Sequence, residues 1–152
     1  MLAVPWAGVP ATLDQLRGSI DGKILIDCTN PMVGRRKPLL VGRTTSGAEE
    51  IAAAAGGSHI VKAFNAIAVR ILASGDATFD GHVATIFHCG DDHEAKTTVA
   101  GLITDCGFAP FDAGPLSVAR YLEPLAALSL RIEDALGRDD DVALNPLVRK
   151  RV

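Results

Sequence analysis

The sequence lacks the features that most directly assign a chain to a class of protein. It contains no Cys-x-x-Cys pair and its cysteines number three, which favours reduced thiols in a cytoplasmic protein over a disulfide framework. No apolar run reaches the roughly 18 residues that a membrane span needs, and residues 1–4 lack the basic region of a secretory signal. Because the net charge is only −3, the composition predicts binding to neither nucleic acid nor an anionic membrane.

The remaining signal is a regular alternation of strands and helices. A chain of 152 residues that is 48% hydrophobic can form one domain with a sizeable core. The expected strands are residues 2–4, 23–28, 59–64, 83–89 and 108–111, and the expected helices are 7–17, 46–55, 66–73, 92–105 and 115–136. This order predicts an α/β sheet with helices on its faces. Ser46 with Glu49 and Asp91 with Glu94 have the spacing of capping boxes.

The helix expected at 115–136 is apolar on most of its circumference. Such a helix must be buried on most sides, and one sheet covers only one side. We therefore expect a homodimer formed through this helix. Arg120 and Glu123 lie within reach of each other on it, so we expect them to organise the buried helix rather than perform chemistry.

Five motifs occur in order along the chain. They are Val4-Pro5-Trp6, Asp27-Cys28-Thr29-Asn30-Pro31, Val61-Lys62-Ala63-Phe64-Asn65, Gly90-Asp91-Asp92, and the run from Asp112 to Pro124. Together they resemble the NADPH-dependent reductases related to coenzyme F-420 (deazaflavin):NADP oxidoreductase. The cytosolic domain of the six-transmembrane ferric reductases is a more distant relative.

The resemblance implies a fold and a kind of site. The fold would be an incomplete Rossmann-type, doubly wound α/β sheet of about five strands, with the last two antiparallel to the rest and a long C-terminal helix. Residues 1–136 would be part of an NAD(P)-binding domain, and 137–152 an irregular tail. The cofactor-binding residues implied are Val4, Pro5, Trp6, Asn30, Pro31, Ala63 and Asn65. The implied reaction is hydride transfer between NADPH and a flavin-like or other small acceptor, which needs no catalytic acid or base.

One part of the family pattern has no counterpart. No Gly-x-Gly-x-x-Gly follows a strand, although backbone N–H groups of that turn bind the pyrophosphate in this fold. We therefore expect a dinucleotide-binding half to lie outside this chain. Two alternatives are a non-catalytic dimeric remnant that acts as an interaction module, and a protein that binds a flavin-like ligand without turnover. The sequence does not choose NADPH over NADH or name the acceptor.

Several of these residues also have purely structural interpretations. Asn30 can form a turn before Pro31, and Asn65 can cap the following helix. Lys62 is expected to pair with a carboxylate or with backbone at its strand end. The cations at 35–37 and 43 form either a solvated loop or an attraction for an anionic ligand. His88 to His93 lack metal-ligand spacing, so we expect no metal there.

Overall fold

The central sheet has the strand order and directions that the sequence predicts. The computed structural model describes residues 1–149. Its sheet contains β1 (Ile24–Asp27), β2 (His59–Lys62), β5 (Thr85–Gly90) and β6 (Ala109–Asp112) in that order. Strand β2 is parallel to β1, and β5 is antiparallel to β2 with β6 parallel to it, so the last two strands run opposite to the first two. The first expected strand is reduced to a parallel bridge between Leu2 and Asp27.

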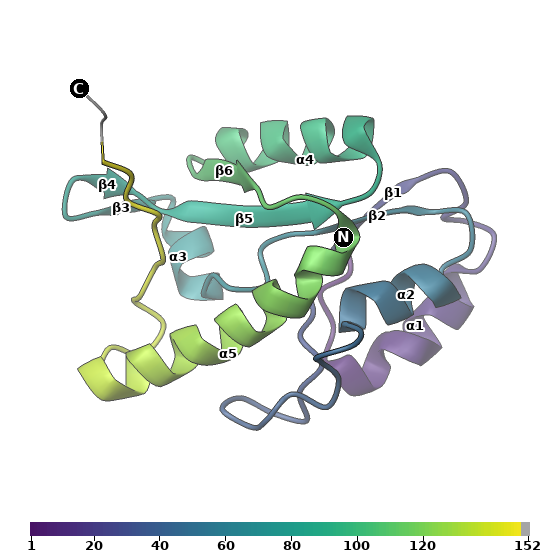
Figure 1. Cartoon of the computed structure of the whole chain (residues 1–152), viewed down its shortest axis with the longest axis horizontal. Coiled ribbons are helices and arrows are strands. Elements are labelled where there is room, and N and C mark those ends of the chain that lie inside the picture. The colour runs from purple at the N-terminus through teal and green to yellow at the C-terminus, as the bar shows by residue number, and fades with distance from the viewer. Residues whose placement is uncertain (150–152) are drawn as a thin grey trace.

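Helices cover both faces of the sheet. They are η1 (Trp6–Gly8), α1 (Val9–Leu16), α2 (Gly47–Ala54), α3 (Val69–Ser74), α4 (His93–Asp105), η2 (Leu116–Val118) and α5 (Ala119–Leu136). Helix α4 lies on one face, and α1, α2 and α5 lie on the other (Figure 1). Each face has its own core cluster, and α3 packs in the same cluster as α4. A short hairpin of β3 (Thr78–Phe79) and β4 (His82–Val83), turning at Asp80-Gly81, was not predicted.

Polar side chains define where the helices begin. Ser46 caps α2 as predicted, since its hydroxyl accepts from the Glu49 N–H and donates to the Glu49 carboxylate. The prediction for α4 was wrong by one residue. Asp92 is the cap and accepts from the Ala95 N–H at 2.7 Å. Asp91 accepts instead from the Leu116 N–H, and it thereby ties the end of β5 to the approach to α5.

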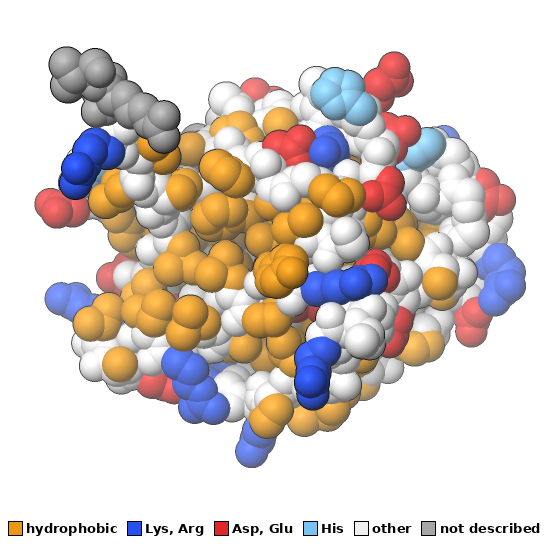
Figure 2. All heavy atoms as spheres, in the orientation of Figure 1, with side chains coloured by type: hydrophobic (Ala, Val, Ile, Leu, Met, Phe, Trp, Pro, Cys, Tyr) orange, Lys and Arg blue, Asp and Glu red, His pale blue; other side chains and the backbone are white. Residues whose placement is uncertain are grey.

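Helix α5 buries a stripe that is partly polar, and it leaves apolar side chains outside. Its buried residues include Glu123, Ser129 and Glu133 beside small and aliphatic ones. Tyr121, Leu128 and Leu136 are 74%, 53% and 63% exposed, and hydrophobic side chains gather over α5 and the neighbouring sheet (Figure 2). The apolar circumference read from the sequence therefore consists of a core-facing stripe and an open outer face. The homodimer stays a prediction.

The expected pairing within α5 was wrong. Arg120 forms an ion pair with Glu49 of α2 at 2.6 Å, which holds the pKa of that carboxyl below its usual range. Glu123 instead turns inward and accepts hydrogen bonds from the N–H groups of Gly47 and Ala48. A Cβ at position 47 would lie 3.2 Å from the Glu123 Oε1 and 2.9 Å from the Trp6 ring. Glycine is therefore required where α2 meets α5.

A fully buried ion cluster joins the strands to α5. The Lys62 Nζ lies 2.6 Å from the Asp27 Oδ2 and 3.0 Å from the Glu123 Oε1, and all three side chains are at most 1% exposed. The same ammonium donates to the Thr29 carbonyl at 2.8 Å. The Asp27 carboxylate also accepts from the N–H and the hydroxyl of Thr29. The expectation that Lys62 pairs at its strand end is confirmed, and the cluster connects β1, β2, α2 and α5.

The segment after α5 has neither helix nor strand over residues 137–149. It nevertheless contacts the sheet, because the Thr85 hydroxyl donates to the Asn145 Oδ1 at 2.8 Å and the Thr85 N–H donates to the Leu144 carbonyl. The last residues of the predicted tail, 150–152, lie outside the described part of the chain. In residues 1–149, no helix has the length and apolar character required to cross a bilayer.

Replacing Lys62 should destabilise the fold severely. The substitution Lys62→Met leaves the carboxylates of Asp27 and Glu123 buried without their cation, and removing one member of a buried ion pair costs about 3–5 kcal/mol. Urea unfolding followed by circular dichroism measures the change. The matched control is Lys23→Met, since Lys23 is exposed, and it should change stability by less than about 0.5 kcal/mol. Equal stability of the two variants would contradict this role for the cluster.

Candidate functional site

Two asparagines meet beyond the carboxyl ends of the parallel strands. The register places Asp27 opposite Lys62, and Asn30 and Asn65 each follow three residues later. The Asn30 Nδ2 donates to the Asn65 backbone carbonyl at 2.8 Å, and the Asn65 Nδ2 donates to the Asn30 Oδ1 at 3.0 Å. The Asn65 Nδ2 also donates to the Leu122 carbonyl of α5 at 2.9 Å. The two side chains are thus held to each other and to the helix.

These hydrogen bonds determine which donors and acceptors of Asn30 and Asn65, the amide pair, remain available to a ligand. Both Nδ2 hydrogens of Asn65 are used, whereas its Oδ1 accepts no hydrogen bond from residues 1–149. One Nδ2 hydrogen of Asn30 is also unused. An amide nitrogen carries two donors and its oxygen two acceptor sites. The pair therefore offers a ligand one carbonyl acceptor and one N–H donor, with orientations set by the fold.

An apolar cavity of about 580 Å³ lies on one side of Asn65. It opens at the strand ends and along α3, and its volume falls within the range of roughly 300–1,000 Å³ typical of small-molecule sites. Its lining residues are Met1, Ala3, Val4, Cys28, Phe64, Asn65, Ile67, Val69, Leu72 and Cys106. Phe64 has a left-handed backbone with φ of 63°, a strained conformation for a bulky residue that is often found at functional sites.

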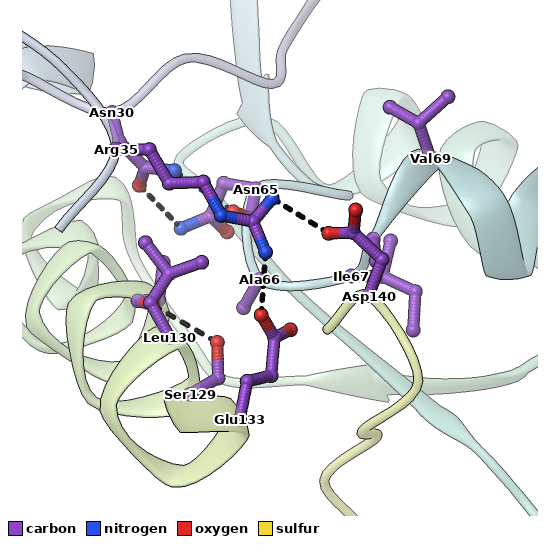
Figure 3. Close-up of a pocket in the computed structure, with 12 residues that line it drawn as sticks. Asn30, Arg35, Asn65, Ala66, Ile67, Val69, Ser129, Leu130, Glu133 and Asp140 are labelled. Carbon is purple, nitrogen blue, oxygen red and sulfur yellow. Dashed lines mark hydrogen bonds and ion pairs between the residues drawn. The ribbon is translucent and has the colours of Figure 1, made fainter. Parts of the chain in front are cut away.

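A polar cavity of about 250 Å³ lies on the other side of Asn65 (Figure 3). It is formed by the loop after β1, the segment between β2 and α3, and α5 with its C-terminal extension. The polar side chains in its lining are Asn30, Arg35, Asn65, Ser129, Glu133 and Asp140. It shares Asn65, Ile67 and Val69 with the apolar cavity, so one short segment borders both.

The structure separates the predicted site residues into two groups. Val4, Asn30 and Asn65 line the cavities. Pro31 and Ala63 are buried behind them. Pro5 is exposed and precedes η1, and Trp6 packs in the core cluster beneath α1 and α2. Cofactor binding by all seven stays a prediction. The geometry holds Asn30 to Asn65 and places Val4 with Asn65 in the lining of the apolar cavity, whereas Trp6 lines neither cavity.

Sequence reasoning missed most of the lining of both cavities. Ile67, Val69 and Leu72 have the pattern of ordinary core residues of a short helix, so no local signal separates them from core. Arg35 and Arg36 were noted as part of a cationic loop, but their partners were not. Their guanidinium groups pair with Glu133, Asp134, Asp139 and Asp140. These ion pairs therefore hold the loop against the C-terminal end of α5 and the segment that follows it, so the loop is not simply solvated.

Two cysteines line the apolar cavity in different states. Burial, with a smaller contribution from the Asp27 carboxylate, raises the pKa of the Cys28 thiol to about 11, whereas Cys106 is exposed at the end of α4.

In the His88 to His93 segment, burial lowers the pKa of His88, and Asp92 serves as a helix cap. Over residues 1–149, no three His, Cys, Asp or Glu side chains are grouped to hold a metal ion.

Alkylation should therefore distinguish the two thiols. A pKa of about 11 leaves only about one Cys28 in a thousand as thiolate at pH 8. Iodoacetamide at pH 8 should modify Cys106 and spare Cys28, and the Cys28 rate should rise about tenfold for each pH unit up to its pKa. Peptide mass spectrometry measures both sites in one sample. Modification of Cys28 at a rate comparable to that of Cys106 at pH 8 would show that the thiol is not buried as described.

No model of a known protein family matches the chain. It is 36% identical over 122 residues to Metalloreductase STEAP3 of Rattus norvegicus, covering 80% of this chain and 23% of the relative. It is 34% identical over 114 residues to human Metalloreductase STEAP2, covering 75% and 21%. The chain thus spans less than a quarter of the length of these curated relatives.

Two solved structures are similar to the chain over most of its length. A candidate F420-dependent NADP reductase of Arthrobacter sp. FB24 matches with a TM-score of 0.81 and 28% identity, over 93% of this chain and 67% of that one. A hypothetical protein of Sinorhizobium meliloti matches with a TM-score of 0.68 and 30% identity, over 78% and 57%. The chain therefore has the Rossmann-like fold of an NADP reductase, with a mixed sheet and a long C-terminal helix.

Proposed function

We propose that this chain contributes the nicotinamide side of an NADP-dependent reductase. The observation that carries the proposal is the amide pair of Asn30 and Asn65, in which Asn65 borders both cavities and Asn30 lines the polar one. Ligands of open α/β sheets bind beyond the carboxyl ends of the strands, where this pair lies. Similarity to a candidate F420-dependent NADP reductase and to metalloreductases supports the same chemistry.

The available atoms of the pair match a carboxamide. A nicotinamide carboxamide presents an N–H donor and a carbonyl acceptor, which complement the Asn65 Oδ1 and the second Nδ2 hydrogen of Asn30. The Leu122 carbonyl fixes the orientation of the Asn65 amide, so little side-chain entropy is lost when a ligand binds. Val4 and Phe64 would supply the apolar wall for the ring.

The chemistry requires no further side chain. Nicotinamide supplies a hydride when it is bound, and transfer needs apposition of two rings and exclusion of water. The lining of the apolar cavity serves both requirements, because within residues 1–149 Asn65 contributes its one polar side chain besides the two thiols. The absence of a nucleophile–base pair in the lining of the cavities is therefore compatible with a reductase.

The pyrophosphate of the dinucleotide, unlike its nicotinamide, has no matching binding motif among the described residues. The sequence has no Gly-x-Gly-x-x-Gly, so the turn that binds the diphosphate in this fold would have to come from another segment or another polypeptide. As acceptor we propose a deazaflavin such as coenzyme F-420, or a flavin, because a planar conjugated ring suits an apolar cavity that ends in an amide.

Binding of reduced nicotinamide mononucleotide tests the proposal without the pyrophosphate. Isothermal titration calorimetry should detect binding to the unmodified chain and at least about fivefold weaker binding to Asn65→Ala, since a hydrogen bond contributes about 1 kcal/mol. The control Asn145→Ala, which removes an exposed asparagine outside both cavities, should bind like the unmodified chain. Equal affinity of all three proteins, or no binding to any, would contradict the proposed site.

A second candidate is a non-catalytic dimeric module, favoured by the exposed apolar face of α5. This module and the reductase both predict a homodimer formed through α5. The substitution Leu128→Glu should weaken the dimer at least about tenfold in sedimentation velocity, because it places a charge in an apolar contact. Leu102→Glu, at a similarly exposed position on α4, is the matched control. A monomeric unmodified chain at micromolar concentration would exclude the dimer.

A further inference from the structure

Among residues 1–149, Arg35 is the one cationic side chain in the lining of the polar cavity, and it pairs with two carboxylates that differ in exposure. Its Nη2 lies 2.7 Å from the Glu133 Oε2, and its Nη1 lies 2.6 Å from the Asp140 Oδ1. Figure 3 shows the guanidinium between the two acids. The Glu133 side chain is 4% exposed, whereas that of Asp140 is 40% exposed. The two contacts therefore differ in how easily solvent or a ligand can replace them.

The position of Asp140 favours its release. It lies beyond the end of α5 in a segment without helix or strand, and its φ of 58° is left-handed, a conformation that residues other than glycine adopt at a cost. Exposed ion pairs contribute little to stability. Breaking the contact with Glu133 would instead leave a buried carboxylate without its partner. Arg35 can thus exchange Asp140 while it keeps Glu133.

We propose that the polar cavity binds a small molecule through a carboxylate or phosphate group on Arg35, and that Asp140 is the internal competitor for this position. A guanidinium binds either anion with the same planar geometry. Anion binding frees the Asp140 carboxylate from Arg35, while the neighbouring Asp139 keeps its pair with Arg36.

The shared border with the apolar cavity gives this site a role in the reductase. A molecule anchored at Arg35 extends toward Asn65, Ile67 and Val69, which border both cavities. The site would therefore select hydride acceptors that carry an acidic group. This last step rests on the proposed function, whereas the anion site and its competitor do not.

Titration with inorganic phosphate and, separately, with malonate tests the site on the whole chain at constant ionic strength. Backbone amide shifts of residues 33–37 and 137–141 in ¹H–¹⁵N NMR spectra report binding and its affinity. Asp140→Asn should bind about two- to fivefold more tightly than the unmodified chain, the range that loss of an exposed ion pair supports. Arg35→Gln should lose the saturable shifts. Arg35→Lys, which keeps the charge but not the fork, should bind at least about threefold more weakly.

The matched control is Asp139→Asn. Asp139 pairs with Arg36, its side chain is 77% exposed, and it is absent from the cavity lining, yet its removal changes the net charge by the same amount. It should leave the affinity unchanged. Equal tightening by Asp139→Asn and Asp140→Asn would overturn the competitor role, and wild-type binding by Arg35→Gln or no saturable binding of either anion would overturn the site. No nicotinamide is present, so these outcomes are independent of the proposed function.

Discussion

The buried ammonium of Lys62 is the interaction on which the site depends. It contacts Asp27 at the end of β1, the Thr29 carbonyl in the following turn and Glu123 on α5. Its donors are thus satisfied by three different parts of the chain, and Glu123 is in turn held by the N–H groups of Gly47 and Ala48. An unpaired charge at this depth would be very costly, so these elements have essentially one relative arrangement. The asparagine pair is built directly on that arrangement.

Two chemically different cavities lie on either side of the short segment that contains Asn65, Ile67 and Val69. Asn65 borders both, and its amide is oriented by α5 through the Leu122 carbonyl. The apolar cavity suits a ring, whereas the polar cavity contains Arg35 between Glu133 and Asp140. A transfer reaction between two bound molecules requires such adjacency, because proximity and orientation supply much of the rate enhancement. The two cavities thus provide the adjacency that the proposed hydride transfer requires.

The sequence predicted those features that depend on local chemistry. The strand order and the Ser46 cap were confirmed, since alternating apolar runs and capping residues act over short distances. The reversal of the last two strands was also confirmed, but the family resemblance implied it and no local pattern did. The partners of Arg35, Arg120 and Glu123 could not be predicted, because each contact joins residues more than 70 positions apart in the sequence. The i, i+3 spacing of Arg120 and Glu123 suggested a local pair, but the buried Lys62 competes more strongly for the glutamate. Cavity linings such as Ile67 and Leu72 were indistinguishable from core.

The N-termini of α2, α4 and η2 each have backbone N–H groups that already donate to side chains. Diphosphates in this fold bind to free backbone N–H groups at a helix N-terminus. The first N–H groups of α2 donate to Glu123 and Ser46, and the first turn of α4 donates to Asp92. The approach to α5 donates to Asp91. A phosphate at any of these named donors would have to displace an internal carboxylate or the Ser46 hydroxyl. Among residues 1–149, the Oδ1 of Asn65 and one Nδ2 hydrogen of Asn30 have no such partner, which is why the proposed function assigns them the nicotinamide rather than the diphosphate.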